Sequence, residues 1–303
     1  MMRYLIAIDR ERGEGILSTE TGIILRYIKE SGEDVISLLK TLTDKIPFSK
    51  KQAAIHISYG DSADVTDCDR LEREIEVWAD ERTAVLCEDR MVHRLYSSFE
   101  EDEQGIALYV YPDAGAGRLH AGGIAVVGGV GAPVFSEGSA FTLGINTVRA
   151  ALSAAEKSGP PSMLVTLLEE AFGLPIQDVR NELAALSPIK LAHYARLAAK
   201  GKEMGDAVST ALWNDMLRGL SSYVYTLSRG EEKLRVKVTE GPKTFSSLLI
   251  ADLSAYLGDR FSVSESKVPI LLGGIKRAAE MLGIPADDRF CLTFLETYKN
   301  IGK

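Results

Sequence analysis

Residues 127–144 read VGGVGAPVFSEGSAFTLG, a glycine-dense stretch that runs directly into a helical pattern. Gly128, Gly129 and Gly131 permit positive φ angles and let the backbone lie against a ligand. Glu137 opens the helix, where its negative charge suits the helix dipole. The apolar stripe of that helix consists of Ala140, Leu143, Val148, Ala151, Leu152 and Ala155. A purely structural role, in which a glycine only lets the helix pack closely on a sheet, is an equally open interpretation at each position.

The apolar pattern around this stretch predicts an α/β protein, with strands before it and mainly helices after it. Strands are expected at 3–9, 22–28, 52–58, 83–87, 105–111, 234–239 and 260–264. Helices are expected at 88–99, 138–157, 161–172, 175–186, 188–200, 204–228, 245–257 and 271–282, with another that carries Val35, Leu38, Leu39 and Leu42. The composition changes near residues 112–118, which predicts two lobes at 1–115 and 116–303.

The composition is that of an ordinary globular protein large enough for two lobes. The chain has 303 residues, of which 46% are hydrophobic and 26% are charged. The formal net charge of −8 argues against a nucleic-acid partner, because such binding depends on clustered Lys and Arg. The longest apolar run, 122–135, is well short of the roughly 18 residues of a membrane span. We therefore expect a cytoplasmic protein without a membrane partner.

The cysteines and histidines show no ligand pattern. Cys68, Cys87 and Cys291 are odd in number and widely spaced, so they indicate buried thiols rather than a disulfide framework or a zinc site. The four histidines are scattered and none lies in an HExxH motif.

The glycine-dense stretch resembles the GGWGxxxGDEGSAYWIG signature of N-acetylglucosamine kinases and the related BadF/BadG/BcrA/BcrD-type ATPases. Further signals follow in that family's order along nearly the whole chain. They are a strand ending at Asp9, a strand-to-helix junction at Asp89, a strand ending in Gly241, and a helix start with Gly-Gly at 268–274. The resemblance implies the two-lobed actin-like ATPase fold, which is ribonuclease H-like, with a cleft between the lobes.

The resemblance also implies an ATP-dependent sugar kinase, acting on an N-acetylglucosamine-like amino sugar, or a BadF-type ATPase, with Mg·ATP bound between the lobes. Asp89 matches the general base that takes the proton of a sugar hydroxyl. Asp9 matches the carboxylate that holds Mg²⁺ through water. Gly129 and Glu137 match sugar-binding positions, and a homodimer through the second lobe is implied. The implied nucleotide contacts are Asp9, Gly13, Gly15, Gly115, Gly117, Gly241 and Gly273.

Three loops depart from the family pattern. The first phosphate loop, DGGGTKT in the family, reads DRERGEG at 9–15, and the second, SGTGS, is replaced by YPDAGAGRLHAGG at 111–123. The adenosine-contacting Gly-Gly-Val is replaced by Glu240-Gly241-Pro242, where the proline lacks a backbone donor. These changes favour an alternative function, that of a catalytically inactive pseudo-kinase acting as a sugar-binding, regulatory or scaffold protein.

Two further alternatives concern single features. Asp89 could be only a helix-start residue stabilised by the helix dipole. The activator ATPases of 2-hydroxyacyl-CoA dehydratases hold an iron–sulfur cluster between cysteines, and the wide spacing of the three cysteines argues against that function here.

Overall fold

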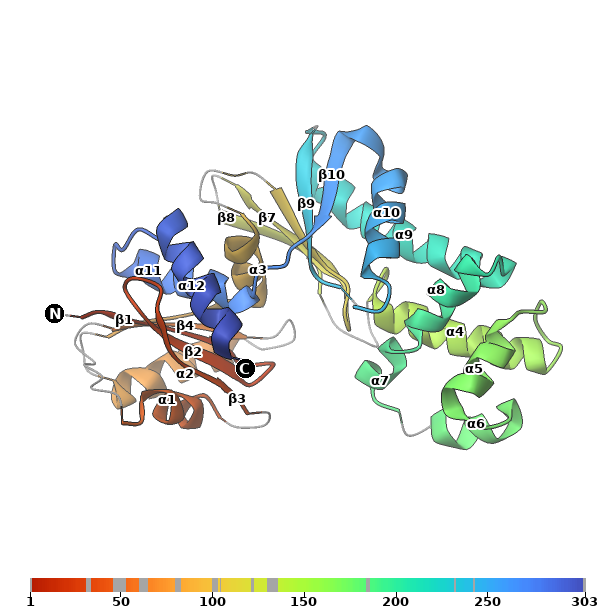
Figure 1. Ribbon diagram of the computed structural model, residues 1–303, viewed down its shortest axis with the longest axis horizontal. Coiled ribbons are helices and arrows are strands. Elements are labelled where there is room, and N and C mark those ends of the chain that lie inside the picture. Colours follow the sequence, from red (N-terminus) through yellow and green to blue (C-terminus); the bar gives the residue numbers. More distant parts are fainter. Residues whose placement is uncertain are drawn as a thin grey trace. The chain divides into compact units, whose positions relative to one another are not determined.

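Figure 1 shows a computed structural model of the protein. The chain folds into two α/β units. The structure describes residues 2–30, 34–45, 53–59, 65–79, 83–99, 103, 105–120, 123–129, 136–183, 186–231, 233–241 and 243–301. Unit 1 comprises Met1–Glu103 together with Lys267–Lys303, and unit 2 comprises Gln104–Ser266. The division expected at 115/116 therefore needs correction, because the last helices of the chain return to the first sheet and bury Leu271, Ile275, Phe290 and Phe294 against it.

Unit 1 is built on a five-stranded sheet in the order β3-β2-β1-β4-β5. Strands β1, β4 and β5 are parallel, and β2 and β3 add an antiparallel hairpin edge. Its elements are β1 (Tyr4–Asp9), β2 (Glu14–Thr19), β3 (Ile24–Lys29), α1 (Val35–Thr43), β4 (Ala53–Tyr59), α2 (Val65–Trp78), β5 (Ala84–Asp89), α3 (Arg90–Ser98), α11 (Ile270–Met281) and α12 (Asp288–Ile301).

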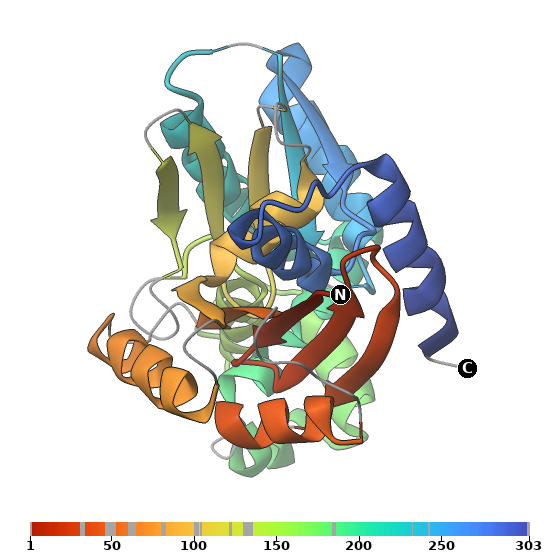
Figure 2. The same cartoon turned by 90° about the vertical axis from the view of Figure 1, so that its left-hand side faces the viewer.

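Helices cover both faces of this sheet, as Figures 1 and 2 show: α1 and α2 lie on one face, and α3 and α11 on the other. Successive side chains of strand β1 point to opposite faces of the sheet, and β1 is buried throughout because helices cover both faces. Tyr4, Ile6 and Ile8 join a core with Leu38, Leu39 and Leu42 of α1 and Leu71 and Ile75 of α2. Leu5 and Ala7 join the core formed with α11 and α12.

Unit 2 contains a second five-stranded sheet, in the order β10-β9-β6-β7-β8. Strand β9 is parallel to both β6 and β10, whereas β6, β7 and β8 form an antiparallel meander. Its elements are β6 (Gly105–Tyr109), β7 (Gly115–His120), β8 (Gly123–Gly128), α4 (Ala140–Ala155), α5 (Leu164–Phe172), α6 (Ile176–Leu183), α7 (Pro188–Ala192), α8 (Ala195–Glu203), α9 (Ala207–Ser228), β9 (Leu234–Glu240), α10 (Ser246–Leu257) and β10 (Phe261–Glu265).

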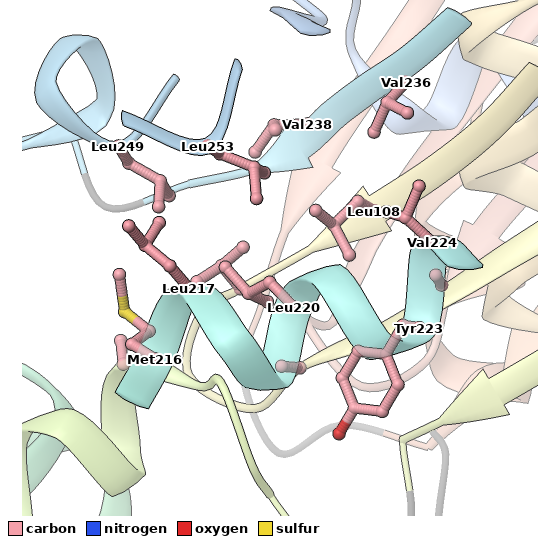
Figure 3. Close-up of a cluster of buried hydrophobic side chains, with 14 of the residues drawn as sticks. Leu108, Met216, Leu217, Leu220, Tyr223, Val224, Val236, Val238, Leu249 and Leu253 are labelled. Carbon is pink, nitrogen blue, oxygen red and sulfur yellow. The ribbon is translucent and has the colours of Figure 1, made fainter. Parts of the chain in front are cut away.

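The core of unit 2 lies between its sheet and helices α9 and α10 (Figure 3). Leu108, Val236 and Val238 come from the strands, and the facing helices contribute Met216, Leu217, Leu220, Tyr223, Val224, Leu249 and Leu253. A separate apolar cluster joins α4, α5, α6 and α8 through Val148, Ala151, Leu164, Leu167, Leu168, Ile176, Val179 and Leu197. Among the described residues, no helix has the length and apolar character needed to cross a membrane.

Candidate functional site

The parallel strands of unit 1 place Asp9 and Asp89 at the same edge of the sheet. Asp9 is the last residue of β1 and pairs in register with Ser58 of β4, while Asp89 is the last residue of β5 and pairs with Tyr59. One strand, β4, separates them. In open α/β sheets, ligands bind outside the carboxyl ends of the strands. The structure therefore brings together the two carboxylates that the sequence singled out.

Asp89 is the N-cap residue of α3. Its Oδ1 accepts a hydrogen bond of 2.6 Å from the backbone N–H of Met91. Its Oδ2 makes no hydrogen bond to any described residue, and the residue is partly exposed. A capping role and a catalytic role are compatible here, because one carboxylate oxygen caps the helix while the other can receive a proton.

Asp9 is completely buried and ion-paired. Its Oδ2 accepts from Nε of Arg90 at 3.0 Å, and its Oδ1 accepts from the backbone N–H of Arg12 at 3.2 Å. The Arg90 side chain is only 4% exposed, and its Nη1 donates to Oε2 of Glu11 at 2.7 Å. A single buried guanidinium thus joins two carboxylates of the first loop to the start of α3.

This geometry does not fit a Mg²⁺ ion held by Asp9. Magnesium requires near-octahedral oxygen ligands and usually keeps several waters, with one or two carboxylates completing its shell. Both oxygens of Asp9 already accept hydrogen bonds from protein donors, and Arg90 supplies the neutralising charge.

The glycines predicted for the nucleotide site in unit 1 have different surroundings. Gly13 has φ +61° and closes the turn after β1, where its N–H donates to the carbonyl of Arg10 at 3.3 Å. Gly15 lies within β2, and a Cβ there would be 2.9 Å from Cδ1 of Leu42. Gly273 lies within α11, where a Cβ would collide with the carbonyl oxygen of His93. Gly13 is therefore near the carboxyl edge, whereas packing against α1 and α3 accounts for Gly15 and Gly273.

A chain of buried and partly buried polar groups, which sequence reasoning missed, lies beside Asp89. Glu88 accepts from Nε and Nη2 of Arg277 at 2.7 and 3.0 Å. His56 Nε2 is 2.8 Å from Oε2 of Glu88, and His56 Nδ1 is 2.7 Å from Nε2 of His93. Both imidazole rings are completely buried. Four side chains from β4, β5, α3 and α11 thus form one network inside unit 1.

The carboxylate fixes the tautomers of the two histidines. Ionised Glu88 can only accept, so Nε2 of His56 carries a proton and its Nδ1 must accept from Nε2–H of His93. Nδ1 of His93 is then a buried acceptor, and it has no hydrogen-bond partner among the described residues. Any proton added there would lack an acceptor. The network is therefore satisfied only while both imidazoles are neutral.

Burial sets the titration of this network. It lowers the pKa of His56 despite the hydrogen bond to Glu88, and it lowers the pKa of His93 well below 6.5, helped by the charges of Arg90 and Arg94. Burial alone would raise the pKa of Glu88, but the hydrogen bonds from His56 and Arg277 outweigh it and lower that pKa to about 2. The folded state thus favours two neutral imidazoles and an ionised carboxylate.

The free energy of unfolding is expected to decrease as the pH falls below about 6.5, because His56 and His93 bind protons more readily in the unfolded chain than in the folded one. The contribution of the two histidines to stability is complete above pH 6.5 and is lost on acidification. The separate contribution of Glu88 is complete above 4.5 and is lost between 4.5 and about 2. Urea unfolding of a variant with His56→Gln and His93→Leu should show a flatter pH dependence between roughly pH 6.5 and 5. A variant whose slope equals that of the wild type would contradict the assignment.

The predicted residues of unit 2 gather mainly at one edge of its sheet. Gly115 begins β7, and Gly129 follows β8 with φ +74°, its N–H donating to the carbonyl of Ala114 at 3.0 Å. Gly241 directly follows β9, and the carbonyl of Glu240 accepts from the N–H of Val110 beside it at 2.9 Å. Gly117 lies further along β7, within the buried part of the strand.

Glu137 lies two residues before the N-cap of α4, which is Ser139 rather than Glu137 itself. Glu137 is exposed, and its carbonyl accepts a hydrogen bond of 2.9 Å from the hydroxyl of Tyr223. The chain from Val110 onward meets the start of α4, because the N–H of Ala140 donates to the carbonyl of Val110 at 2.8 Å. Gly131 of the glycine-dense stretch lies outside the described residues.

A cavity of about 220 Å³ lies between α8 and the turn from β9 to α10 in unit 2. Its lining includes Arg196 and Lys200 of α8 and Lys243, Thr244 and Ser246 of the turn and α10. Sequence reasoning missed these cations because they come from segments 40 residues or more apart in the chain. The lining also contains Glu203, and Nζ of Lys200 is paired with Oε2 of Glu170 at 3.3 Å, so the cavity carries groups of both charges.

Comparison with known proteins identifies solved structures that share this architecture. No protein-family model and no curated protein sequence matches the chain. Among solved structures, a candidate N-acetylglucosamine kinase from Chromobacterium violaceum has a TM-score of 0.71 at 18% identity, over 93% of this chain and 99% of that one. A candidate N-acetylglucosamine kinase from Porphyromonas gingivalis has a TM-score of 0.63 at 14% identity, over 92% and 98%.

A ROK-family glucokinase from Streptomyces griseus, solved in complex with glucose and AMPPNP, has a TM-score of 0.52 at 12% identity, over 92% of this chain and 100% of that one. Identities this low show the fold alone. The two α/β units, their sheets and their order along the chain agree with that fold. The chain therefore has the two-lobed α/β fold of the actin-like sugar kinases.

Proposed function

We propose that this protein transfers a phosphoryl group from ATP to a hydroxyl of a sugar, with an N-acetylglucosamine-like amino sugar as the acceptor. The observation that carries the proposal is the position of Asp89. It ends a parallel strand, caps the following helix with one oxygen and keeps the other oxygen without a partner among the described residues. Proteins named as sugar kinases share the fold, and one of them was solved with glucose and AMPPNP.

In the proposed reaction, Oδ2 of Asp89 accepts the proton of the acceptor hydroxyl as its oxygen attacks the γ-phosphorus and the bond to the β–γ bridging oxygen breaks. The cap to Met91 holds the carboxylate in one orientation, which is the main requirement for such positioning. Gly13 of the first unit and Gly115, Gly129 and Gly241 of the second are the proposed backbone contacts to the nucleotide and sugar. No step in this scheme uses a metal ion on Asp9.

A second candidate function is sugar binding without phosphoryl transfer, and the Asp9–Arg90 pair favours it. A carboxylate that is buried and paired with a guanidinium cannot take up a hydrated metal ion unless Arg90 leaves. Kinases of this general chemistry rely on metal ions bridging the phosphates. The two candidates therefore differ in whether nucleotide binds and turns over, and they share the sugar.

Titration with ATP, ADP and a panel of amino sugars, with and without Mg²⁺, separates the two functions. A ligand that binds only the folded state raises the free energy of unfolding by RT ln(1 + [L]/Kd), about 2.7 kcal/mol at a hundredfold excess over Kd. Stabilisation by nucleotide and by sugar, together with sugar-dependent release of ADP, supports the kinase. Stabilisation by sugar alone supports the binding protein, and no stabilisation by either ligand rejects both.

A further inference from the structure

Two of the three cysteines lie side by side in unit 1. Sγ of Cys68, in α2, is 3.3 Å from Sγ of Cys87, in β5, although the residues are 19 positions apart in sequence. Cys68 is buried and Cys87 is partly exposed. Next to them, the backbone N–H of Cys87 donates to Oε1 of Glu72 at 2.7 Å, so α2 is held to β5 at this point.

The wide spacing of the cysteines along the sequence did not indicate this pairing. The two thiols are already in contact, and a disulfide bond requires their sulfur atoms to approach from 3.3 Å to about 2.05 Å. Cys291 is in the same unit but has a different environment, with its Sγ 3.6 Å from the carbonyl oxygen of Ala286. The geometry therefore singles out one pair and leaves Cys291 as an internal reference.

We propose that Cys68 and Cys87 form a redox-sensitive dithiol that closes to a disulfide on reaction with small-molecule disulfides of the oxidised-glutathione class. The thiolate of one cysteine attacks one sulfur of the reagent and releases one small thiolate. The thiolate of the other cysteine then attacks the protein sulfur of this mixed disulfide and releases the second. The two protein thiols lose two electrons and two protons, and the reagent is reduced to two thiols.

Closure would tie α2 to the strand that ends in Glu88 and Asp89, immediately after Cys87. Burial raises the pKa of both thiols, and the neighbouring Cys68 adds to the rise at Cys87. Because the thiolate is the attacking species, exchange is expected to be slow near neutral pH and to accelerate as the pH rises. This proposal does not depend on the proposed kinase activity.

The test is incubation of the reduced full-length chain with oxidised glutathione at mildly alkaline pH, followed by non-reducing digestion and mass spectrometry. The expected product is a peptide pair joined through Cys68 and Cys87, with two hydrogens lost and no glutathione attached. Cys291→Ser should give the same product, whereas Cys68→Ala should carry glutathione on Cys87. A wild-type protein that carries glutathione on Cys87 while Cys68 stays reduced, or that links either cysteine to Cys291, would overturn the proposal.

Hydrogen exchange of α2 provides a second readout. A cross-link across 19 positions restricts the unfolded chain, and opening of α2 should become less frequent on the order of 100-fold after oxidation. The protection should disappear on reduction and should not develop in Cys68→Ala treated in the same way. Equal exchange before and after oxidation, in a sample where the linked peptide is present, would show that the bond does not restrain α2.

Discussion

Replacing Asp89 with Asn is expected to slow phosphoryl transfer by a factor of roughly 10² to 10⁴ while leaving nucleotide and sugar affinity nearly unchanged. The amide oxygen of Asn can still accept the hydrogen bond from the N–H of Met91, so the cap on α3 is kept. What the amide cannot do is take the proton of the acceptor hydroxyl. Turnover measured by ADP release, and affinity measured by calorimetry, should therefore separate.

The chain offers a matched control in Asp34. Asp34 is the N-cap of α1, and its Oδ1 accepts from the N–H of Ser37 at 2.9 Å, the same capping role in the same unit. Asp34→Asn should leave turnover unchanged, which separates the effect of the charge at the carboxyl edge from that of a cap. An active protein whose turnover is the same with Asp89→Asn would leave Asp89 with its capping role alone.

The elements that could be predicted from the sequence are those whose structure is determined by residues close together in the chain. Strand β1 could be predicted because five successive apolar or β-prone residues, 4–8, precede Asp9. The junction at Asp89 could be predicted because a strand passes directly into an amphipathic helix. The two sheets, and hence the two-lobed α/β fold, agree with the prediction. The resemblance carried by residues 127–144 pointed to the fold that the solved structures share.

Elements stabilised mainly by distant partners were missed. Strands β7 and β8 contain several glycines, which weaken a strand in isolation. They form because β7 pairs with both β6 and β8, and β8 pairs with β7. Strand β2 follows β1 after a short charged turn, and α2 and α12 were left out of the predicted elements altogether. Helix α12 belongs to unit 1 only through its packing on the first sheet, which no local pattern reveals.

The same limit applies to the candidate site. The positions of Asp9 and Asp89 at strand ends could be predicted, but their partners could not. Arg90 reaches Asp9 across 81 positions of sequence, and His56 reaches His93 across 37. These contacts depend on the order β1-β4-β5 and on α3 packing beside them, so they become visible only in three dimensions. The contact between Arg90 and Asp9 also bears directly on whether the altered first loop can bind a nucleotide.

Arg90→Met is expected to lower the free energy of unfolding by about 3–5 kcal/mol, because it leaves the completely buried carboxylate of Asp9 without its cation. Met keeps much of the apolar volume of the side chain, so the loss reports mainly on the charge. Urea unfolding at neutral pH measures it. Adding Asp9→Asn to Arg90→Met should recover much of the stability, because the double variant buries no unpaired charge.

A surface ion pair of the same unit is the control for this effect. Nε of Arg70 is 3.9 Å from Oε1 of Glu74, and the two side chains are 65% and 56% exposed. Arg70→Met should cost no more than about 1 kcal/mol, since water solvates the Glu74 carboxylate that remains. A loss of similar size for Arg90→Met would mean that Asp9 is not held as a buried pair.

Metal binding by the Arg90→Met variant extends the same argument to function. Removing the guanidinium takes away the cation that Asp9 and Glu11 share, and an added divalent cation can take its place. Millimolar Mn²⁺ or Mg²⁺ should therefore raise the unfolding midpoint of Arg90→Met and leave that of the wild type and of the Asp9→Asn, Arg90→Met double variant unchanged. If the wild type is stabilised as much as Arg90→Met, Asp9 accepts a metal ion without losing its arginine, and the objection to metal-assisted phosphoryl transfer at this edge no longer holds.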